Sequence, residues 1–360
     1  MKNKVLSTLI LMLLSFSVSY GLVTEEEMAR EHSLLMNRKY SSARLIFAGD
    51  LMMHMPTVNS VLYQEGGDFS RIFEHVTPYL KGADFSVVNL ETTLTSGGEY
   101  SGYPRFKSPL SLAEGIRKAG FDGVVTANNH AYDYRDEGVL TTLNALEEAG
   151  LKATGTFRGS EEAGPLIFEI NRVSLGITNM TYGINGMGPV ERTAVNLISE
   201  ELLKQDYEAM VRRGTDVEIV FFHWGNEYQF NPDRVQEHLG ALAREIGYDL
   251  IIGSHPHVVQ PVIIGKDSLT VYSLGNFISN QRDGFKDLGL MVDLTVEKTL
   301  EGIEIRNIDL IPTWVNQRDQ GSYHYRVIPL RGDFESLESI DARERDHLGN
   351  LMEKFDELMP

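Results

Sequence analysis

The 360-residue chain contains no cysteine. Disulfide bonds and thiolate-bound metals are therefore excluded, and any metal has to be held by His, Asp, Glu or Asn side chains. Positive charge is also scarce: 33 Lys and Arg residues stand against 51 Asp and Glu residues, for a formal net charge of −18. A surface this acidic disfavours nucleic acid and anionic lipid as partners, and it repels a polyanionic polymer except where a bound cation reverses the local field.

The chain opens on an apolar run that is too short for a comfortable membrane span. Val5 to Val18 is almost unbroken and follows Lys2 and Lys4. This order is typical of a secretory signal, so we expect residues 1–21 to be a signal peptide, with an uncleaved signal anchor as the alternative. Either reading predicts an exported protein that is periplasmic, extracellular or anchored at the outer face of the cytoplasmic membrane.

Neither an internal repeat nor a low-complexity segment is present, and from Arg44 onwards strand-like apolar runs alternate with segments of helical spacing. This alternation predicts an α/β fold with a mostly parallel core. Glycines 120, 150 and 214 stand where helices should end. We expect strands at 44–49, 85–89, 123–127, 166–170, 173–179, 218–223, 250–253, 269–274, 290–296 and 303–310. We expect helices at 69–80, 110–119, 135–149, 199–213 and 232–246.

Two pairs of predicted strands, at 166–179 and 290–310, lack an intervening helix. They predict antiparallel hairpins added to the sheet or, alternatively, a second packed sheet. Outside the alternating region, residues 22–43 are polar and charged, which predicts a linker. Residues 331–360 are charged with helical spacing, which predicts a C-terminal helix on the surface.

Five of the predicted strands end in residues that bind metals or move protons. Ligands of open α/β sheets bind outside the carboxyl ends of the strands, so these endings can converge on one crevice. Carboxylate, carboxamide and imidazole together suit one or two divalent ions of Zn, Mn, Fe or Co. The residues are Asp50, Glu91, Asn128, Asn129, His130, His223, His255 and His257.

Each of these residues also has a plainer structural interpretation when taken alone. Asp50 suits a turn or a helix N-cap, and the Asn128-Asn129 dipeptide is common in turns. His223 suits a satisfied core histidine. The pair His255 and His257 is the hardest to explain structurally, because alternate residues at a strand end point the same way.

Several further residues lie near these strand ends in the sequence and are candidates for the same site. His54 follows Asp50 by four residues and can reach the same cleft or its entrance. For the substrate we expect contacts from Arg105, Lys107, Trp224, Glu227 and Asn276. A cation at Arg105 or Lys107 suits a carboxylate or phosphate group of a substrate. Two plainer interpretations remain: one of these cations pairs with Glu91, and Trp224 packs in the core.

The order of the motifs resembles the CapA family of capsule and poly-γ-glutamate synthesis proteins, over residues 44–330. The motifs are Gly49-Asp50, Asn89-Leu90-Glu91, Asn128-Asn129-His130, His223-Trp224-Gly225, Gly253-Ser254-His255-Pro256-His257 and Leu274-Gly275-Asn276. This family is similar to the calcineurin-like metallophosphoesterases. The resemblance implies a four-layer α/β/β/α sandwich with a metal site between the strand ends.

The resemblance also implies roles. Glu91 stands at the place of a bridging carboxylate, and His130 at that of the histidine that assists the leaving group. The metal ligands implied are Asp50, Glu91, Asn129, His223, His255 and His257. The sequence departs from the phosphoesterase pattern at Met52, where those enzymes carry a histidine ligand.

Three functions fit these observations. The first is a metal-dependent hydrolase of the cell surface, acting on a phosphoester or a γ-glutamyl bond. The second is a non-catalytic component for assembly or export of a surface polymer, working beside membrane-bound polymer-synthesis subunits. The third is a solute-binding module, which does not require His130 beside the ligand set. The surface polymer or its precursor is the expected partner of the first two.

Overall fold

The computed structural model describes residues 41–188, 192–299, 302–319, 322–331 and 340–359, together with residues 24, 26, 27 and 30. The predicted signal peptide lies outside the described residues. Among the helices within these ranges, none has the length and apolarity needed to cross a membrane.

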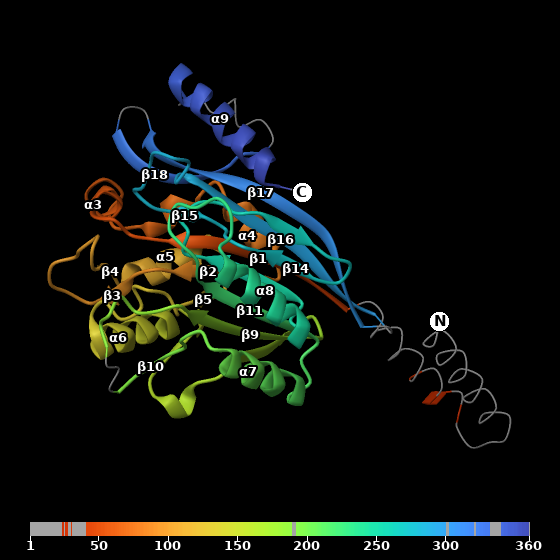
Figure 1. Ribbon diagram of the computed structural model, residues 1–360. Coiled ribbons are helices and arrows are strands. Elements are labelled where there is room, and N and C mark those ends of the chain that lie inside the picture. The colour runs from red at the N-terminus through yellow and green to blue at the C-terminus, as the bar shows by residue number, and fades with distance from the viewer. Residues whose placement is uncertain are drawn as a thin grey trace.

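Two large sheets form the centre of the molecule (Figure 1). The first sheet has the strand order β18 (Ser322–Pro329), β17 (Gly302–Asp319), β16 (Leu288–Thr299), β1 (Ser41–Leu51), β2 (Phe85–Leu90), β5 (Gly123–Val125) and β6 (Lys152–Thr154), with β15 (Asn276–Ile278) beside β1. The second has the order β13 (Val262–Ile264), β14 (Leu269–Val271), β12 (Leu250–Ser254), β11 (Val217–His223), β9 (Val173–Thr181) and β8 (Leu166–Ile170). Two short pairs join β3 (Thr93–Thr95) to β4 (Lys107–Pro109) and β7 (Thr156–Phe157) to β10 (Ala194–Val195).

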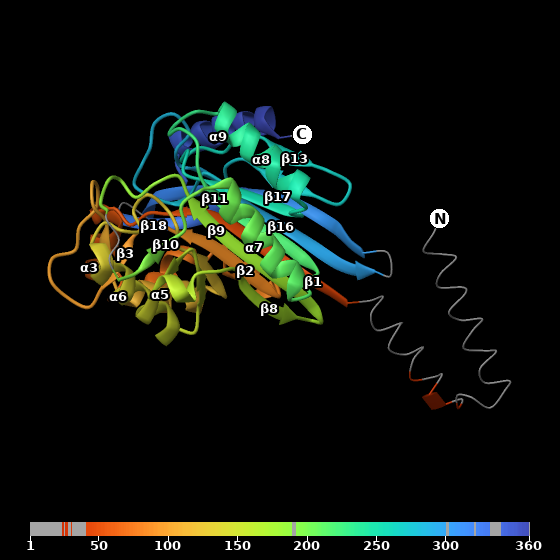
Figure 2. The ribbon, with the colours of Figure 1, turned by 60° about the horizontal axis from the view of Figure 1, so that its bottom comes forward.

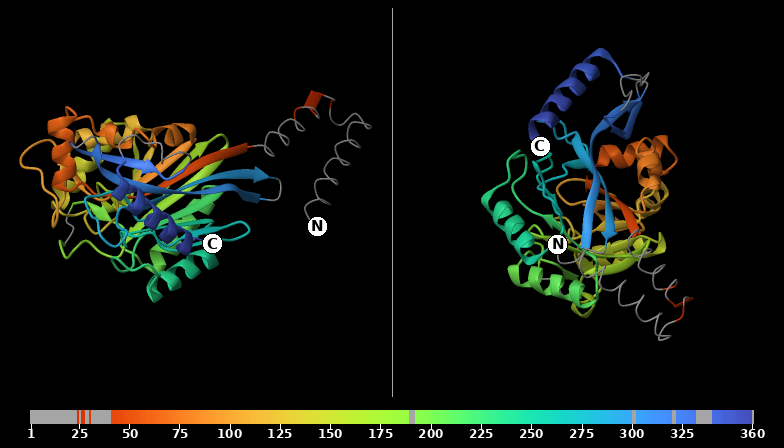
Figure 3. Two further views of the ribbon diagram at one scale, coloured as in Figure 1. Left: turned by 90° about the horizontal axis from the view of Figure 1, so that it is seen from above. Right: turned by 90° about the vertical axis from the view of Figure 1, so that its right-hand side faces the viewer.

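Helices cover the outer faces of both sheets (Figure 2; Figure 3, right). On the first sheet lie α3 (Met55–Gln64), α4 (Thr77–Gly82), α5 (Ser111–Ala119) and α6 (Arg135–Glu148). On the second lie α7 (Glu200–Arg212) and α8 (Arg234–Ile246). Two 3₁₀ helices, η1 (Phe69–Phe73) and η2 (Ser160–Glu162), lie in connections, and α9 (Ala342–Leu358) ends the described chain.

The side-chain alternation of β1 shows why this arrangement has four layers. Leu45 and Phe47 belong to the apolar core between the two sheets. Ile46 and Ala48 point the other way, into the core under the helices of the first sheet. Successive side chains of a strand face opposite sides, so a strand that is apolar at every position needs a covered surface on both faces. The predicted four-layer α/β/β/α sandwich is confirmed.

Several local predictions are confirmed as well. Strands β1, β2, β5 and β6 are parallel neighbours, and so are β9, β11, β12 and β14. The predicted hairpins are the antiparallel pairs β8–β9 and β16–β17. Gly120, Gly150 and Gly214 end helices with φ values of 114°, 73° and 73°, which a residue without a side chain adopts at no steric cost.

Other predictions were wrong in instructive ways. The helix expected at 69–80 is divided into η1 and α4, because Pro78 lacks a backbone N–H and starts a new helix in its first turn. Strand β1 already begins at Ser41, so residues 41–43 of the predicted linker belong to the sheet. Strands β15 and β18 and helix α3 were not predicted.

The C-terminal helix is more than a surface helix. Leu348, Leu351 and Phe355 of α9 are buried and belong to the apolar core between the sheets. Figure 1 shows α9 above β17 and β18. The helix therefore completes the cover of the inter-sheet core beside β17 and β18.

Replacing Leu351 by alanine should destabilise this cover. Leu351 is fully buried, so truncation leaves a cavity, and we expect the free energy of unfolding to fall by about 2–5 kcal/mol. Urea unfolding monitored by circular dichroism measures the change. Asp346→Ala, at an exposed position of the same helix, is the matched control and should shift stability by less than about 0.5 kcal/mol. Equal effects of the two substitutions would contradict the packing of α9 described above.

Candidate metal centre

The carboxyl ends of the parallel strands of both sheets meet at one place. From the first sheet, β1 carries Asp50, and the segments after β2 and β5 carry Glu91 and Asn129. From the second sheet, β11 ends in His223, whose Nε2 lies 2.9 Å from Asn129 Oδ1. The predicted convergence of the strand ends is therefore present, and every one of these residues is buried.

Asp50 connects the two sheets through both of its carboxylate oxygens. Oδ1 accepts a hydrogen bond from Asn89 Nδ2 at 2.8 Å within the first sheet. Oδ2 accepts from the backbone N–H of His255 at 3.2 Å and from His257 Nδ1 at 3.0 Å, both in the loop after β12. Asp50 therefore fixes the position of the histidine loop against β1.

Glu91 is the most unusual group in this cluster. It is fully buried, and within the described chain neither of its carboxylate oxygens has a hydrogen-bond partner. Oε1 lies 3.6 Å from His223 Nε2 and 3.8 Å from His257 Nε2. Burial and the charge of Asp50 raise the pKa of this carboxyl well above its usual range. A buried carboxylate without donors is costly unless a cation neutralises it.

Glu91 is shared by two groups of residues whose ligand atoms lie within 4.8 Å of one another. One group is Glu91, His255 and His257, and the other is Asp50, Glu91 and His223. In the first group His255 Nδ1 is also buried without a partner among the described residues. Two oxygen-and-nitrogen ligand sets joined by one carboxylate fit a pair of borderline divalent ions, so the residues present fit the predicted metal.

Two of the candidate ligand histidines, His223 and His255, have lowered pKa values that favour the neutral form needed for metal binding. Burial and the neighbouring imidazoles lower the pKa of His223 well below its usual range, and burial with the charge of His257 lowers that of His255 to about 3. A neutral imidazole offers a lone pair, whereas an imidazolium offers none.

The loop with the two histidines has a backbone that corrects one expectation. Strand β12 ends at Ser254, and His255 and His257 adopt φ values of 99° and 57°, in the left-handed region. The pair is therefore not an alternating strand end. Hydrogen bonds of 2.8 Å from Tyr228 N to Pro256 O and 3.3 Å from Asn276 Nδ2 to His257 O hold the loop. A strained conformation at non-glycine residues is typical of functional sites.

His130 stands beside the ligand set with its own carboxylate partner. His130 Nδ1 donates to Asp133 Oδ2 at 2.8 Å, and the backbone N–H of Phe106 donates to the same oxygen at 2.6 Å. The Phe106 ring meets the His130 ring edge-on, at 4.7 Å between centroids. Asp133 therefore fixes the orientation of the imidazole and leaves Nε2 for a substrate.

The family is settled by comparison with known proteins. The model of the family described as "Bacterial capsule synthesis protein PGA_cap" matches residues 44–281, which include the whole ligand cluster. The chain belongs to this family. The predicted resemblance to the CapA proteins is thereby confirmed.

Two curated relatives carry the CapA name. "Capsule biosynthesis protein CapA" of Bacillus anthracis is 29% identical over 258 residues, covering 68% of this chain and 62% of the relative. "PGA biosynthesis protein CapA" of Bacillus subtilis is 28% identical over 246 residues, covering 65% and 63%. The matched region thus spans less than two thirds of the length of either relative.

Solved structures of phosphoesterases are similar at a lower level. A "novel phosphatase" from Mycoplasma pneumoniae has a TM-score of 0.47 and 19% identity, over 76% of this chain and 94% of that one. The "calcineurin-like phosphoesterase YfkN" of Bacillus subtilis has a TM-score of 0.44 and 14% identity, over 76% and 90%.

Asn128 and His54 were also predicted to belong to the site. They lie close to the candidate metal ligands but belong to neither of the two groups of ligand residues. Asn128 donates to Asn89 Oδ1 at 3.2 Å and to Leu90 O at 2.8 Å, so its amide braces the adjacent strand end. His54 Nδ1 accepts from the backbone N–H of Asn280 at 3.2 Å. Burial and the charge of His257 lower the pKa of His54 to about 4, so this imidazole is neutral at neutral pH.

The expected substrate contacts divide into two kinds. Trp224 is buried in the core under α8, where its indole N–H donates to Tyr272 O at 2.8 Å, so it packs and does not face the cleft. Asn276 is also fully buried, and it holds the histidine loop. Both expectations are corrected, because local spacing does not show which side of a strand end a side chain takes.

The charged candidates contact the segment after β5 or act on Glu91. Arg105 Nε donates to the backbone carbonyl of Asp133 at 2.9 Å, and its guanidinium lies 4.7 Å from the Tyr134 ring centroid. Lys107 Nζ lies 5.0 Å from the same centroid. Glu227 is exposed, and its charge contributes to the raised pKa of Glu91. A contact of these three side chains with a substrate stays a prediction.

Two aromatic residues border the histidines, and one of them, Tyr182, was not assigned from the sequence. Tyr182 follows β9, is 50% exposed, and has its ring centroid 4.6 Å from that of His255. Tyr228 is 44% exposed, and its ring centroid lies 6.2 Å from that of His257. Tyr182 stands at a sixth strand end, and this position is the signal that could have identified it.

Proposed function

We propose that this PGA_cap-family chain is a metal-dependent hydrolase that acts on a phosphoester or γ-glutamyl bond of a surface polymer or its precursor. The observation that carries the proposal is Glu91, a buried carboxylate that has no donor among the described residues and is shared by two groups of candidate ligand residues. Binding alone does not explain His130 and Asp133, which add a proton-transfer pair beside the ligands.

The residues that would hold one or two divalent ions are Asp50, Glu91, Asn129, His223, His255 and His257. Such ions polarise the bond to be cleaved and lower the pKa of a bound water. Asp50 orients the His255–His257 loop by accepting from it, as the partners of ligand histidines do in other metal sites.

His130 would supply the proton for the leaving group. Its Nδ1 proton is directed at Asp133, so Nε2 is the atom that can face a substrate. The Phe106 ring excludes water from one side of this imidazole, and Asp133 stabilises its protonated form. Arg105 and Lys107 would attract an anionic group of the substrate beside it, against the acidic charge of the chain as a whole.

The place of action belongs to the same proposal. The apolar start of the chain favours export, so that the body of the protein works outside the cytoplasmic membrane, beside membrane-bound subunits that make the polymer. The relatives named for capsule and PGA biosynthesis support a polymer as the substrate.

A second candidate is a non-catalytic component of polymer assembly or export, and one residue favours it. Met52 is buried at the position where the phosphoesterase pattern has a histidine ligand, and its backbone N–H donates to Ile278 O at 2.8 Å. A centre with one ligand fewer can bind a metal and a polymer end without cleaving a bond.

Replacing His130 by alanine separates the two candidates. The protein, loaded with Mn²⁺ or Zn²⁺, is assayed against bis(p-nitrophenyl) phosphate and against γ-glutamyl oligomers. We expect one of these substrates to be cleaved, and we expect His130→Ala to lower kcat by about 10²–10⁴-fold, because the proton donor is lost. Asp133→Asn should lower it less, since the imidazole remains.

Metal content is the control for this experiment. His130 belongs to neither ligand group, so His130→Ala should bind as much metal as the unmodified protein. Metal binding without turnover of either substrate would reject the hydrolase in favour of the assembly component. Unchanged kcat in His130→Ala would reject the role of the histidine.

A further inference from the structure

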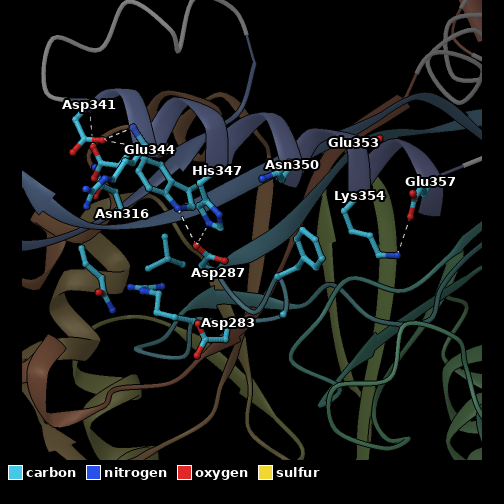
Figure 4. A pocket seen from close by; sticks show the side chains of 17 residues that line it. Asp283, Asp287, Asn316, Asp341, Glu344, His347, Asn350, Glu353, Lys354 and Glu357 are labelled. Atoms are coloured by element: carbon cyan, nitrogen blue, oxygen red, sulfur yellow. Dashed lines mark hydrogen bonds and ion pairs between the residues drawn. The ribbon is translucent and has the colours of Figure 1, made fainter.

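A second cavity lies apart from the metal ligands, between α9, β17 and the loop from Arg282 to Asp287 (Figure 4). Its volume of about 840 Å³ falls within the range of small-molecule sites. Phe285, Trp314 and Val315 form apolar parts of its wall. None of the candidate metal ligands lines it, and nothing in the hydrolase proposal uses it.

Two buried polar groups in this wall are incompletely paired. Asp287 is 3% exposed, and its Oδ2 accepts from His347 Nε2 at 2.7 Å and from Trp314 Nε1 at 3.2 Å. Its Oδ1 has no hydrogen-bond partner within the described chain. Figure 4 shows Asp287 below His347, among the side chains that line the cavity. A buried acceptor left unpaired costs stability, so a donor is expected to complete it.

The second incompletely paired group is a cation, the guanidinium of Arg282. Arg282 Nη1 donates to Gln281 O at 3.0 Å, whereas Nη2 is buried and has no partner in the part of the chain that the structure describes. Burial lowers the pKa of this guanidinium to about 10, despite the nearby charge of Asp287. The wall of one cavity therefore contains a carboxylate oxygen and a guanidinium N–H that are both unpaired within the described residues.

The remaining charged side chains of the wall favour a ligand that carries positive charge. Arg282, Arg343 and Lys354 are the permanent cations, and His347 bonds Asp287. The carboxylates are more numerous: Asp283, Asp287, Asp341, Glu344, Glu353 and Glu357. Among them Asp341 and Glu344 form the capping box of α9, and Glu357 pairs with Lys354 at 2.9 Å. Asp283 and Glu353 are exposed and form no ion pair within the described residues.

We propose that this cavity binds a free α-amino acid with a basic side chain. The α-ammonium group donates to Asp287 Oδ1, and the α-carboxylate accepts from Arg282 Nη2. The methylene stem of the ligand packs on Phe285 and Trp314, and the side-chain cation lies among the carboxylates of the rim. A polyanion is excluded by the same carboxylates, so the cavity is not an extension of the polymer site.

The probe is L-lysine, titrated into the full-length, metal-loaded protein by isothermal calorimetry. We expect saturable binding of one equivalent. Nα-acetyl-L-lysine lacks the α-ammonium group and L-lysinamide lacks the carboxylate, so each should bind about tenfold more weakly or worse, because a charged hydrogen bond is lost. L-glutamate should bind more weakly than L-lysine.

Asp287→Asn is the decisive variant, because its carbonyl oxygen can still accept from Trp314 and His347 while the free acceptor becomes an N–H₂ group. We expect it to weaken L-lysine by about tenfold or more without lowering the melting temperature of the unliganded protein by more than a few degrees. Arg282→Gln should weaken it similarly.

Glu201→Gln on α7 removes the same charge far from the cavity and should leave the affinity for L-lysine unchanged. Absence of saturable binding, equal affinity for L-glutamate, or equal weakening by Glu201→Gln would each overturn the proposal. Because the readout is binding at a separate cavity, these outcomes are independent of whether the metal centre hydrolyses any bond.

Discussion

Replacing Glu91 by glutamine should empty the metal centre while leaving the fold intact. Glu91 belongs to both groups of ligand residues, so one substitution weakens two ion sites at once. Glutamine has nearly the same volume, but its amide carries no charge to offset the ions. We expect metal affinity to fall by roughly 100-fold or more, beyond the loss typical of residues that only support a ligand. Calorimetric titration of the metal-free protein with Zn²⁺ and Mn²⁺ measures it.

The number of ions bound distinguishes a two-ion site from a one-ion site. If Glu91 bridges two ions, the unmodified protein binds two equivalents and Glu91→Gln loses both. If only one ion is bound, His255→Ala and His223→Ala will have unequal effects, because they belong to different ligand groups. Glu201→Gln, with its exposed carboxylate on α7, is the matched control. Full metal occupancy in Glu91→Gln would show that this carboxylate is not a ligand.

The same substitution should stabilise the metal-free protein. Burial and the charge of Asp50 raise the folded-state pKa of Glu91 well above that of the unfolded chain. Between these two values the folded state binds more protons than the unfolded state, so the stability of the unmodified protein falls as pH rises above about 4.5. Glutamine does not titrate, and it avoids the buried charge. At neutral pH we expect Glu91→Gln to be more stable by roughly 1–3 kcal/mol.

Urea unfolding of both proteins in a chelator, at several pH values between 4.5 and 8, measures this difference. The gap between Glu91→Gln and the unmodified protein should widen with rising pH. Adding metal should reverse the order, because only the unmodified protein gains binding energy in the folded state. A metal-free Glu91→Gln protein that is less stable at every pH would mean that Glu91 has a favourable partner in the absence of metal.

Much of the centre could be predicted because its ligands share a simple local context. Asp50, His223 and the residues after β2, β5 and β12 each follow an apolar run, and parallel strands place such endings at one edge of a sheet. The order of the motifs then predicted the family, which the match over residues 44–281 confirms. The hairpins and the glycine helix ends also follow from local patterns.

The errors have a different origin. Trp224 follows His223 in the sequence but points into the core, and Asn276, which follows a predicted strand, holds the histidine loop. The buried face of α9 belongs to the core between the sheets, which no local pattern reveals. In each case the decisive contact joins segments far apart in the chain.

The sequence by itself determined the ligand chemistry, the strand ends that carry it and the family. Its lack of cysteine restricted the ligands to oxygen and imidazole nitrogen, and its alternating patterns placed them after strands. Only the tertiary structure decided that Glu91 lies between His223 and His257 without a donor in the part of the chain that the structure describes. The physical reason is that side-chain periodicity is a local property, whereas the stacking of two sheets sets which strand ends face each other and which buried charges remain uncompensated.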